Sequence, residues 1–211
     1  MLTATPAVLG FIGLLVGSNG EKLVRMAISP QRITPCDPTS VQLVAHLKGK
    51  YIGPLQNVLV VNQGNQVSFV VSFGIGDVTK NRVFVGEPGL FDTGSNVLVM
   101  PWDIAGQALH WLETAGQASV TIRDDRGFFE ISCQDAKYLP SITYFMQGWN
   151  GEEVVPLEIP PASYVYKKTE AVCILAITFG DRWILGLPAL IGHYFLYDWQ
   201  NARIGFAKVS V

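Results

Sequence analysis

Charged residues are scarce in this sequence of 211 amino acids. It has 15 Lys and Arg against 17 Asp and Glu, so charged residues make up 15% of the chain and the formal net charge is −2. Basic side chains that are so few and so scattered cannot assemble the positive face that binds a nucleic-acid backbone. We therefore expect no nucleic-acid partner.

Long hydrophobic runs are also absent. The most apolar stretch, residues 7–17, is shorter than the roughly 20 residues that a membrane-spanning helix needs, so we expect no membrane span. Two interpretations of residues 7–17 remain open. A secretory signal fits the length, although no Lys or Arg precedes the run. A β-strand is the other interpretation.

Cysteine is rare, and nothing in the sequence suggests a metal or cofactor. Three Cys, at positions 36, 133 and 173, leave one pair and one extra, and no Cys or His lies at ligand spacing from Cys133 or Cys173. The acidic pairs at 124–125 and 152–153 lie in turn-like polar stretches, which favours solvated loops over metal ligands. We expect no metal site and no cofactor.

Turn formers and strand formers are plentiful. The 21 Gly, 12 Pro and many β-branched and aromatic residues predict an all-β fold of short strands with one or two short helices. Strands are expected at 23–28, 41–47, 58–61, 67–73, 83–85, 120–122 and 128–131, with a hairpin turn at 124–127. One helix is expected within 102–115, because Ile104, Ala108, Trp111 and Leu112 fall on one helical face.

The chain is organised around residues 91–101, where Asp92-Thr93-Gly94-Ser95 lies between two apolar stretches. Gly94 allows a tight turn, and Thr93 and Ser95 supply hydroxyls that can bond the backbone or a carboxylate. The loop has no Lys and so is not a phosphate-binding loop. Taken alone, it also fits an ordinary Asx-type turn between strands.

Motifs in a fixed order give this loop a context. After Asp92-Thr93-Gly94-Ser95 come Pro101, the helical segment, Cys133, the run 139–145, residues 156–164, Cys173, Trp183-Ile184-Leu185-Gly186, and finally 194–198 and 204–207. Over residues 49–211 this order resembles the C-terminal lobe of the pepsin-like (eukaryotic) aspartic peptidases. The resemblance implies a double-sheet, β-barrel-like lobe. It also implies a disulfide between Cys133 and Cys173, which leaves Cys36 as the extra cysteine. A disulfide implies an oxidising compartment, so the protein would be secreted or would be lysosomal or vacuolar.

The resemblance further implies an aspartic endopeptidase, in which two Asp residues activate a water molecule. Asp92 would be the catalytic residue, and Thr93, Gly94 and Ser95 would shape its loop. Asp-Thr-Gly or Asp-Ser-Gly occurs only once in the sequence, so the chain carries half of such a site and should be inactive alone. Leu187 stands where the family often has Asp, and Asn96 where this lobe usually has Ser.

Two alternatives follow from the single motif. The chain could be a catalytically inactive pepsin-like module that binds peptides, or a lobe that is active only as a dimer. The expected partners are a peptide or protein substrate and either an N-terminal lobe or a second copy of the chain. Residues 1–48 match the family poorly and are expected to be a remnant of the N-terminal lobe, an interlobe segment or a signal-like start. If they are a remnant of the N-terminal lobe, residues 8–14 would resemble the apolar-apolar-Gly strand that ends that lobe.

Overall fold

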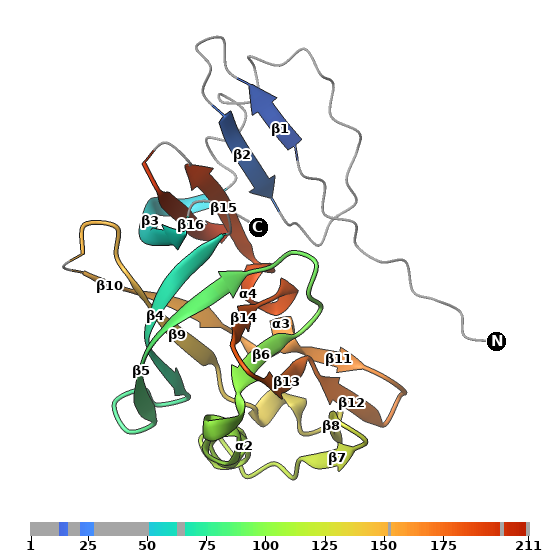
Figure 1. The fold of residues 1–211 in the computed structure, drawn as a ribbon. Coiled ribbons are helices and arrows are strands. Elements are labelled where there is room, and N and C mark those ends of the chain that lie inside the picture. The colour runs from blue at the N-terminus through green and yellow to red at the C-terminus, as the bar shows by residue number, and fades with distance from the viewer. Residues whose placement is uncertain are drawn as a thin grey trace. The chain divides into compact units, whose positions relative to one another are not determined.

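The structure, a computed structural model, describes residues 13–16, 22–27, 51–62, 66–151, 153–198 and 201–209. Its strands are β1 (Gly13–Val16), β2 (Lys22–Ala27), β3 (Tyr51–Asn62), β4 (Val67–Ile75), β5 (Arg82–Phe91), β6 (Leu98–Pro101), β7 (Arg123–Asp125), β8 (Phe128–Ser132), β9 (Ile142–Gln147), β10 (Val154–Ile159), β11 (Val165–Lys167), β12 (Val172–Leu175), β13 (Ile177–Gly180), β14 (Trp183–Leu185), β15 (His193–Asp198) and β16 (Arg203–Val209). Its helices are η1 (Trp102–Ile104), α2 (Ala105–Thr114), η2 (Ala136–Tyr138), α3 (Pro161–Tyr164) and α4 (Leu187–Leu190). The predicted all-β class with a few short helices is confirmed (Figure 1).

The chain forms two compact units, one of residues 1–57 with 190–211 and the other of residues 58–189. In the first unit the strand order is β1-β2-β15-β16-β3, and β15 pairs antiparallel with both β2 and β16. Phe195 and Phe206 face each other across β15 and β16, with ring centroids 5.7 Å apart, and both are buried. The strand predicted at 23–28 is confirmed by β2.

One carboxyl group of the first unit has a shifted pKa. Burial of Asp198 acts to raise its pKa, but hydrogen bonds from Asn201 and from Arg203 outweigh that effect and hold the pKa below its usual value. The Arg203 Nε–H donates to Asp198 Oδ2 at 2.9 Å across the β15–β16 pair. The hydrogen bonds therefore stabilise the ionised form of this carboxyl.

The second unit contains the larger sheet, with the strand order β3-β4-β5-β14-β6-β13 and with β9 pairing to β4 and to β10. Its core is aromatic: the rings of Phe73, Tyr144 and Trp183 lie 5.2 to 5.7 Å from one another, and all three are almost fully buried. These rings come from β4, β9 and β14, so they join three strands that are distant in sequence. Edge and tilted contacts of this kind add to the stabilisation from buried area.

A four-stranded sheet, β11-β12-β8-β7, completes the second unit. Cys133 follows β8 and Cys173 lies in β12, and their sulfur atoms are bonded. The predicted disulfide is therefore confirmed. The backbone aligns the two residues, because Cys173 pairs with Ile131 and the Cys133 N–H donates to the Ala171 carbonyl at 2.9 Å.

The predicted helix is confirmed as η1 followed by α2, and Ala108, Trp111 and Leu112 are its buried residues. The strand predicted at 120–122 is wrong, because β7 begins at Arg123. Val120 N–H instead donates to the Glu113 carbonyl at 2.9 Å and Ile122 N–H donates to Glu113 Oε1 at 3.1 Å. These bonds tie the segment to the end of α2 and leave it unavailable for pairing in a sheet.

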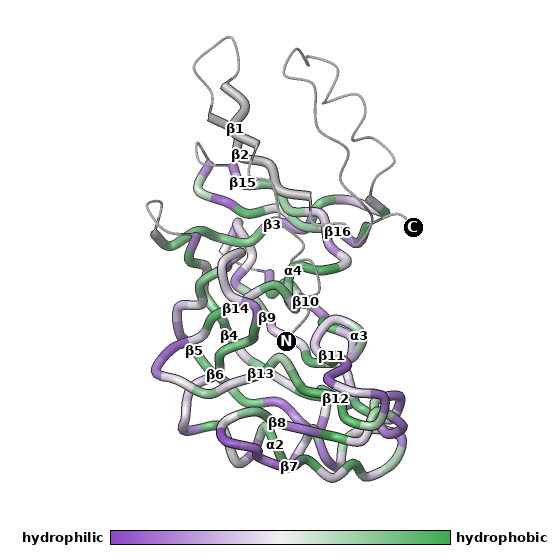
Figure 2. Tube along the Cα trace, turned by 90° about the vertical axis from the view of Figure 1, so that its right-hand side faces the viewer, coloured by the Kyte–Doolittle hydropathy of each residue, from purple (hydrophilic) through white to green (hydrophobic). Residues whose placement is uncertain are grey.

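Hydropathy follows this architecture. In Figure 2 hydrophobic colour runs along the strands of the second unit, and hydrophilic colour gathers around α2 and β7.

None of the helices in the described ranges is long and apolar enough to cross a membrane. The expectations for residues 7–12, for the strand at 41–47 and for Cys36 lie outside the described residues.

Candidate functional site

Asp92 lies where two strands of the second unit diverge. It directly follows β5, and β6 begins only at Leu98, so residues 92–97 form a loop between the ends of these strands (Figure 1). A third strand, β14, lies between β5 and β6 and pairs parallel with the first and antiparallel with the second. The two strands that flank the loop are therefore joined by β14, a strand that comes from much later in the chain.

Hydrogen bonds fix the carboxylate and the loop. Asp92 Oδ1 accepts the Gly94 N–H at 2.8 Å, and the Asp92 N–H donates to the Leu185 carbonyl at 3.0 Å. At the other side of the loop, the Ser95 carbonyl accepts the Leu187 N–H at 2.8 Å. The Asp92 side chain is half-buried, so the carboxylate is both positioned and accessible.

Gly186 lets the end of β14 lie directly against the backbone of the Asp92 loop. A Cβ atom at this position would lie 2.2 Å from the Val97 carbonyl oxygen and 2.6 Å from the Ser95 carbonyl oxygen. Real Cβ atoms essentially never come within 3.0 Å of such neighbours, so only glycine fits while the loop keeps its position. The glycine of the Trp183-Ile184-Leu185-Gly186 motif thus acts by letting the strand end lie against the Asp92 loop.

A row of half-buried apolar side chains crosses the sheet beside this loop. The register aligns Val67 with Leu90, Leu90 with Ile184, and Ile184 with Val99, and it ends at Thr178 on β13. The opposite side of these strands is core, since the neighbouring residues Phe91, Leu98 and Leu185 are fully buried. Alternation directs Leu90 and Asp92 to the same side of β5, so this apolar row leads up to the carboxylate.

The far end of the β5–β14 ladder is closed by a side-chain hydrogen bond. Trp183 Nε1–H donates to Glu87 Oε2 at 2.9 Å. The two strands pair over only three residues, from Gly89–Trp183 to Phe91–Leu185, so this bond adds a constraint at the end of the ladder that lies away from Asp92. Sequence reasoning missed Glu87, because an isolated Glu before a strand end has no motif.

The structure brings together the residues of the predicted active-site loop. Asp92, Thr93 and Ser95 are half-buried, and Gly94 is exposed. Leu187, the departure from the family pattern, contributes its backbone N–H to the loop and so needs no particular side chain for that contact. The family resemblance predicted that the Asp92 loop and the Trp183-Ile184-Leu185-Gly186 strand lie together, and the bond from the Asp92 N–H to the Leu185 carbonyl confirms this. It did not specify the contacts of residues 186 and 187 with residues 95 and 97.

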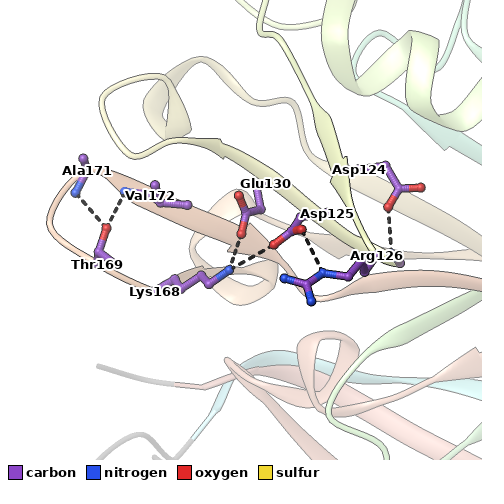
Figure 3. A network of polar contacts seen from close by, with 9 residues as sticks. Asp124, Asp125, Arg126, Glu130, Lys168, Thr169, Ala171 and Val172 are labelled. Carbon is purple, nitrogen blue, oxygen red and sulfur yellow. Dashed lines mark hydrogen bonds and ion pairs between the residues drawn. The ribbon is translucent and has the colours of Figure 1, made fainter.

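The predicted solvated turn at 124–127 has an ion-pair network (Figure 3). Lys168 Nζ contacts Glu130 Oε1 and lies 3.5 Å from Asp125 Oδ2, and Arg126 Nε lies 3.4 Å from Asp125 Oδ1. The hydrogen bond to Glu130 is the main reason that the pKa of Lys168 is raised. Asp124 Oδ1 accepts the Gly127 N–H at 2.7 Å and so closes the turn.

No group of three or more potential metal ligands occurs in the described part of the chain.

The fold and the loop define a class of protein. The molecule contains an all-β, pepsin-like acid protease lobe, with one Asp-Thr-Gly loop braced by a later strand that ends in glycine. The comparison with known families agrees with this description. The chain belongs to the eukaryotic aspartyl protease family, whose model matches residues 41–209.

Known relatives place the chain within that family. It is 28% identical to gastricsin of Macaca fuscata fuscata over 148 residues, which are 67% of this chain and 36% of that protein. It is also 28% identical to gastricsin of Homo sapiens, over 67% of this chain and 35% of that protein. Its identity to pepsin B of Canis lupus familiaris is 28%, over 65% of this chain and 34% of that protein. The matches therefore span about a third of the length of these relatives.

Proposed function

We propose that this chain supplies one half of the active site of an aspartic endopeptidase, with Asp92 as its catalytic carboxylate. The observation that carries the proposal is the braced loop. A backbone amide donates to Asp92 Oδ1, and the backbone before the carboxylate is bonded to β14. A carboxylate held in this way is preorganised to take part in proton transfer.

The chemistry requires a second carboxylate. When two carboxyl groups face each other across a water molecule, like-charge repulsion keeps one of them protonated. The ionised group takes a proton from the water as the water attacks the peptide carbonyl, and the protonated group donates to the oxygen that gains charge. Because Asp92 is the only Asp-Thr-Gly or Asp-Ser-Gly residue here, its partner would come from an N-terminal lobe or from a second copy of the chain.

The apolar row beside Asp92 suggests what the site would accept. Leu90, Ile184 and Val99 present half-buried aliphatic side chains along the approach to the carboxylate. An apolar substrate side chain placed on them would remove further hydrocarbon surface from water. We therefore propose a peptide or protein substrate with an apolar residue next to the bond that is cleaved.

Peptidase activity in acid tests the proposal. The chain is assayed alone, and together with a separately expressed first lobe of a family member, against a peptide with apolar residues at its centre. We expect little cleavage by the monomer, because loss of one acid–base partner lowers the rate by about 10²–10⁴-fold or more. Cleavage should appear with the added lobe and disappear with Asp92→Asn. Activity that survives Asp92→Asn would contradict the assignment.

Two other outcomes correspond to other functions. Cleavage that rises with the square of the chain concentration, without an added lobe, would indicate an active dimer. Peptide binding without cleavage, even with the added lobe, would indicate a catalytically inactive binding module. The apolar row favours this second candidate over an inert remnant, because it does not depend on a second carboxylate.

The domain assignment and the location are part of the proposal. Residues 49–211 would form the C-terminal lobe of the peptidase, and residues 1–48 would be what remains of the N-terminal lobe, an interlobe segment or a signal-like start. The disulfide fits an oxidising compartment. A secreted protein or a lysosomal or vacuolar one would meet this requirement.

A further inference from the structure

A second feature of the larger sheet lies on strands β5, β4, β9 and β10. Their register aligns Phe84 with Ser72, Ser72 with Phe145, and Phe145 with Pro156. Arg82 is two residues before Phe84 and therefore projects from the same face. The neighbouring row, which contains Phe73 and Tyr144, is core, so the row with Phe84 lies on the other face of these strands, where Arg82, Phe84 and Pro156 are exposed.

The guanidinium group of Arg82 is held in place from two directions. Its Nε–H donates to Ser72 Oγ at 2.8 Å, and its central carbon lies 3.7 Å from the centre of the Phe145 ring. Ser72 is 3% exposed and Phe145 is 9% exposed, so both supports belong to the packed part of the sheet. A planar guanidinium that is bonded through Nε and stacked on a ring keeps its two Nη groups available as a fork of donors.

This fork has no acidic partner among the described residues. The ion pairs of the described ranges involve other cations, namely Lys80, Arg126, Lys167, Lys168 and Arg203. Surface arginines usually move among many rotamers, and fixing one costs conformational entropy. Arg82 is fixed by neutral groups, so its charge remains available for an anion.

Phe84 supplies an apolar surface beside the fork. Its side chain is 80% exposed, the largest exposed fraction among the large hydrophobic residues of the described ranges. Gly86 has a positive φ of 69°, and a Cβ there would lie 2.9 Å from the Phe84 ring, so the ring rests over the glycine backbone. An exposed aromatic ring next to a fixed cation can contact both ends of an amphipathic ligand.

We propose that Arg82 and Phe84 form a binding site for a carboxylate that carries an apolar group. The carboxylate oxygens would accept from the two Nη groups of Arg82, the bidentate geometry that guanidinium favours. The apolar group would lie on the exposed ring of Phe84. An arylpropionate, in which two methylene groups separate the carboxylate from an aromatic ring, is a ligand of this kind. The site does not include Asp92 and does not depend on peptidase activity.

The probe is 3-phenylpropionate, added to the full chain at pH 6 while the Arg Nε–H signals are followed by NMR. The Arg82 signal should shift and saturate. The neutral 3-phenylpropanamide should leave it in place, and acetate and inorganic phosphate should bind at least about threefold more weakly, because they lack the contact with Phe84. Equal binding by phosphate or acetate, or an equal shift with the amide, would overturn the proposal.

Variants separate the two contacts from general effects on folding. Arg82→Lys keeps the charge but loses the fork and should weaken binding by about tenfold or more, which one-dimensional ligand signals can report. Phe84→Ser should weaken it by about threefold or more. Arg126→Lys, which changes an exposed guanidinium of the hairpin turn, and Asp92→Asn should bind as the wild type does. Wild-type affinity in Arg82→Lys, or in Phe84→Ser, would contradict the site.

Discussion

Gly186→Ala tests the idea that the Asp92 loop is braced by the end of β14. The added Cβ would lie 2.2 Å from the Val97 oxygen, whereas contacts of Cβ atoms essentially never fall below 3.0 Å. The backbone must therefore move apart by about 0.8 Å or more, since a carbonyl oxygen cannot rotate away as a flexible side chain can. Such a movement opens the bond from Leu187 N–H to the Ser95 carbonyl.

The expected cost combines two effects. Overpacking in a well-packed region costs about 1–3 kcal/mol, and loss of a buried hydrogen bond costs about 0.5–1.5 kcal/mol more. We expect Gly186→Ala to lower the free energy of unfolding by about 2–4 kcal/mol. Urea unfolding followed by tryptophan fluorescence measures this, and an unchanged dependence on urea concentration would show that the unfolded state is not affected.

Gly106→Ala is the matched control. Gly106 lies in α2, and a Cβ there would meet nothing within 4 Å. Alanine in an open helical position should raise the free energy of unfolding by about 0.5–1 kcal/mol. If Gly186→Ala unfolds within about 0.5 kcal/mol of the wild type, the loop is not braced as described, because even modest overpacking would exceed that value.

Three further changes probe the rest of the fold. Replacing Cys133 and Cys173 together by Ala should lower the free energy of unfolding by about 3–4 kcal/mol, since the bond closes a separation of 40 residues; a loss below about 1 kcal/mol in urea would contradict this. Tyr164→Phe removes a buried O–H that donates to the Pro140 carbonyl at 2.5 Å, so thermal unfolding should show a loss of about 1–2 kcal/mol, and no loss would show that the bond is not stabilising. Asp198 has a lowered pKa, so its contribution is present above the ordinary carboxyl pKa of 3.8 and disappears as the pH falls through the lower folded-state value. Between about pH 5 and pH 2 the wild type should therefore lose more stability than Asp198→Asn, and parallel pH profiles would refute this.

Local patterns in the sequence predicted much of the fold. Alternation and strand-forming residues predicted β4 and β5, and apolar periodicity placed Ala108, Trp111 and Leu112 on the buried face of α2. The disulfide between Cys133 and Cys173 followed from the family resemblance, because the three possible pairs among three Cys could not be separated by spacing alone. The strands and the helix are set by short segments, and the disulfide was inferred from the order of motifs, so a single sequence was enough to predict them.

Contacts between distant segments were not predictable in this way. Nothing near Asp92 indicates that β14 inserts between β5 and β6, because strand pairing leaves no local pattern when the partners are far apart. The strand predicted at 120–122 failed for a different reason: the carbonyl and the carboxylate of the nearby Glu113 accept the N–H groups of Val120 and Ile122, and alternation of apolar residues does not reveal this. The hydrogen bond between Glu87 and Trp183 depends on that insertion and was missed with it.

The residues that brace the Asp92 loop are translated long after the loop itself. At about 5–20 residues per second, Leu185 follows Asp92 by roughly 5–20 s. During that interval β5 can pair with β4, but the carbonyl that accepts the Asp92 N–H and the glycine that lies against the loop have not yet been made. The nascent chain thus has only the bonds within the Asp92 loop, such as the one from Gly94 N–H to Asp92 Oδ1, until the segment at 183–187 emerges. The two segments that position the Asp92 loop are thus made about 90 residues apart, and the loop gains its brace only after the second has been translated.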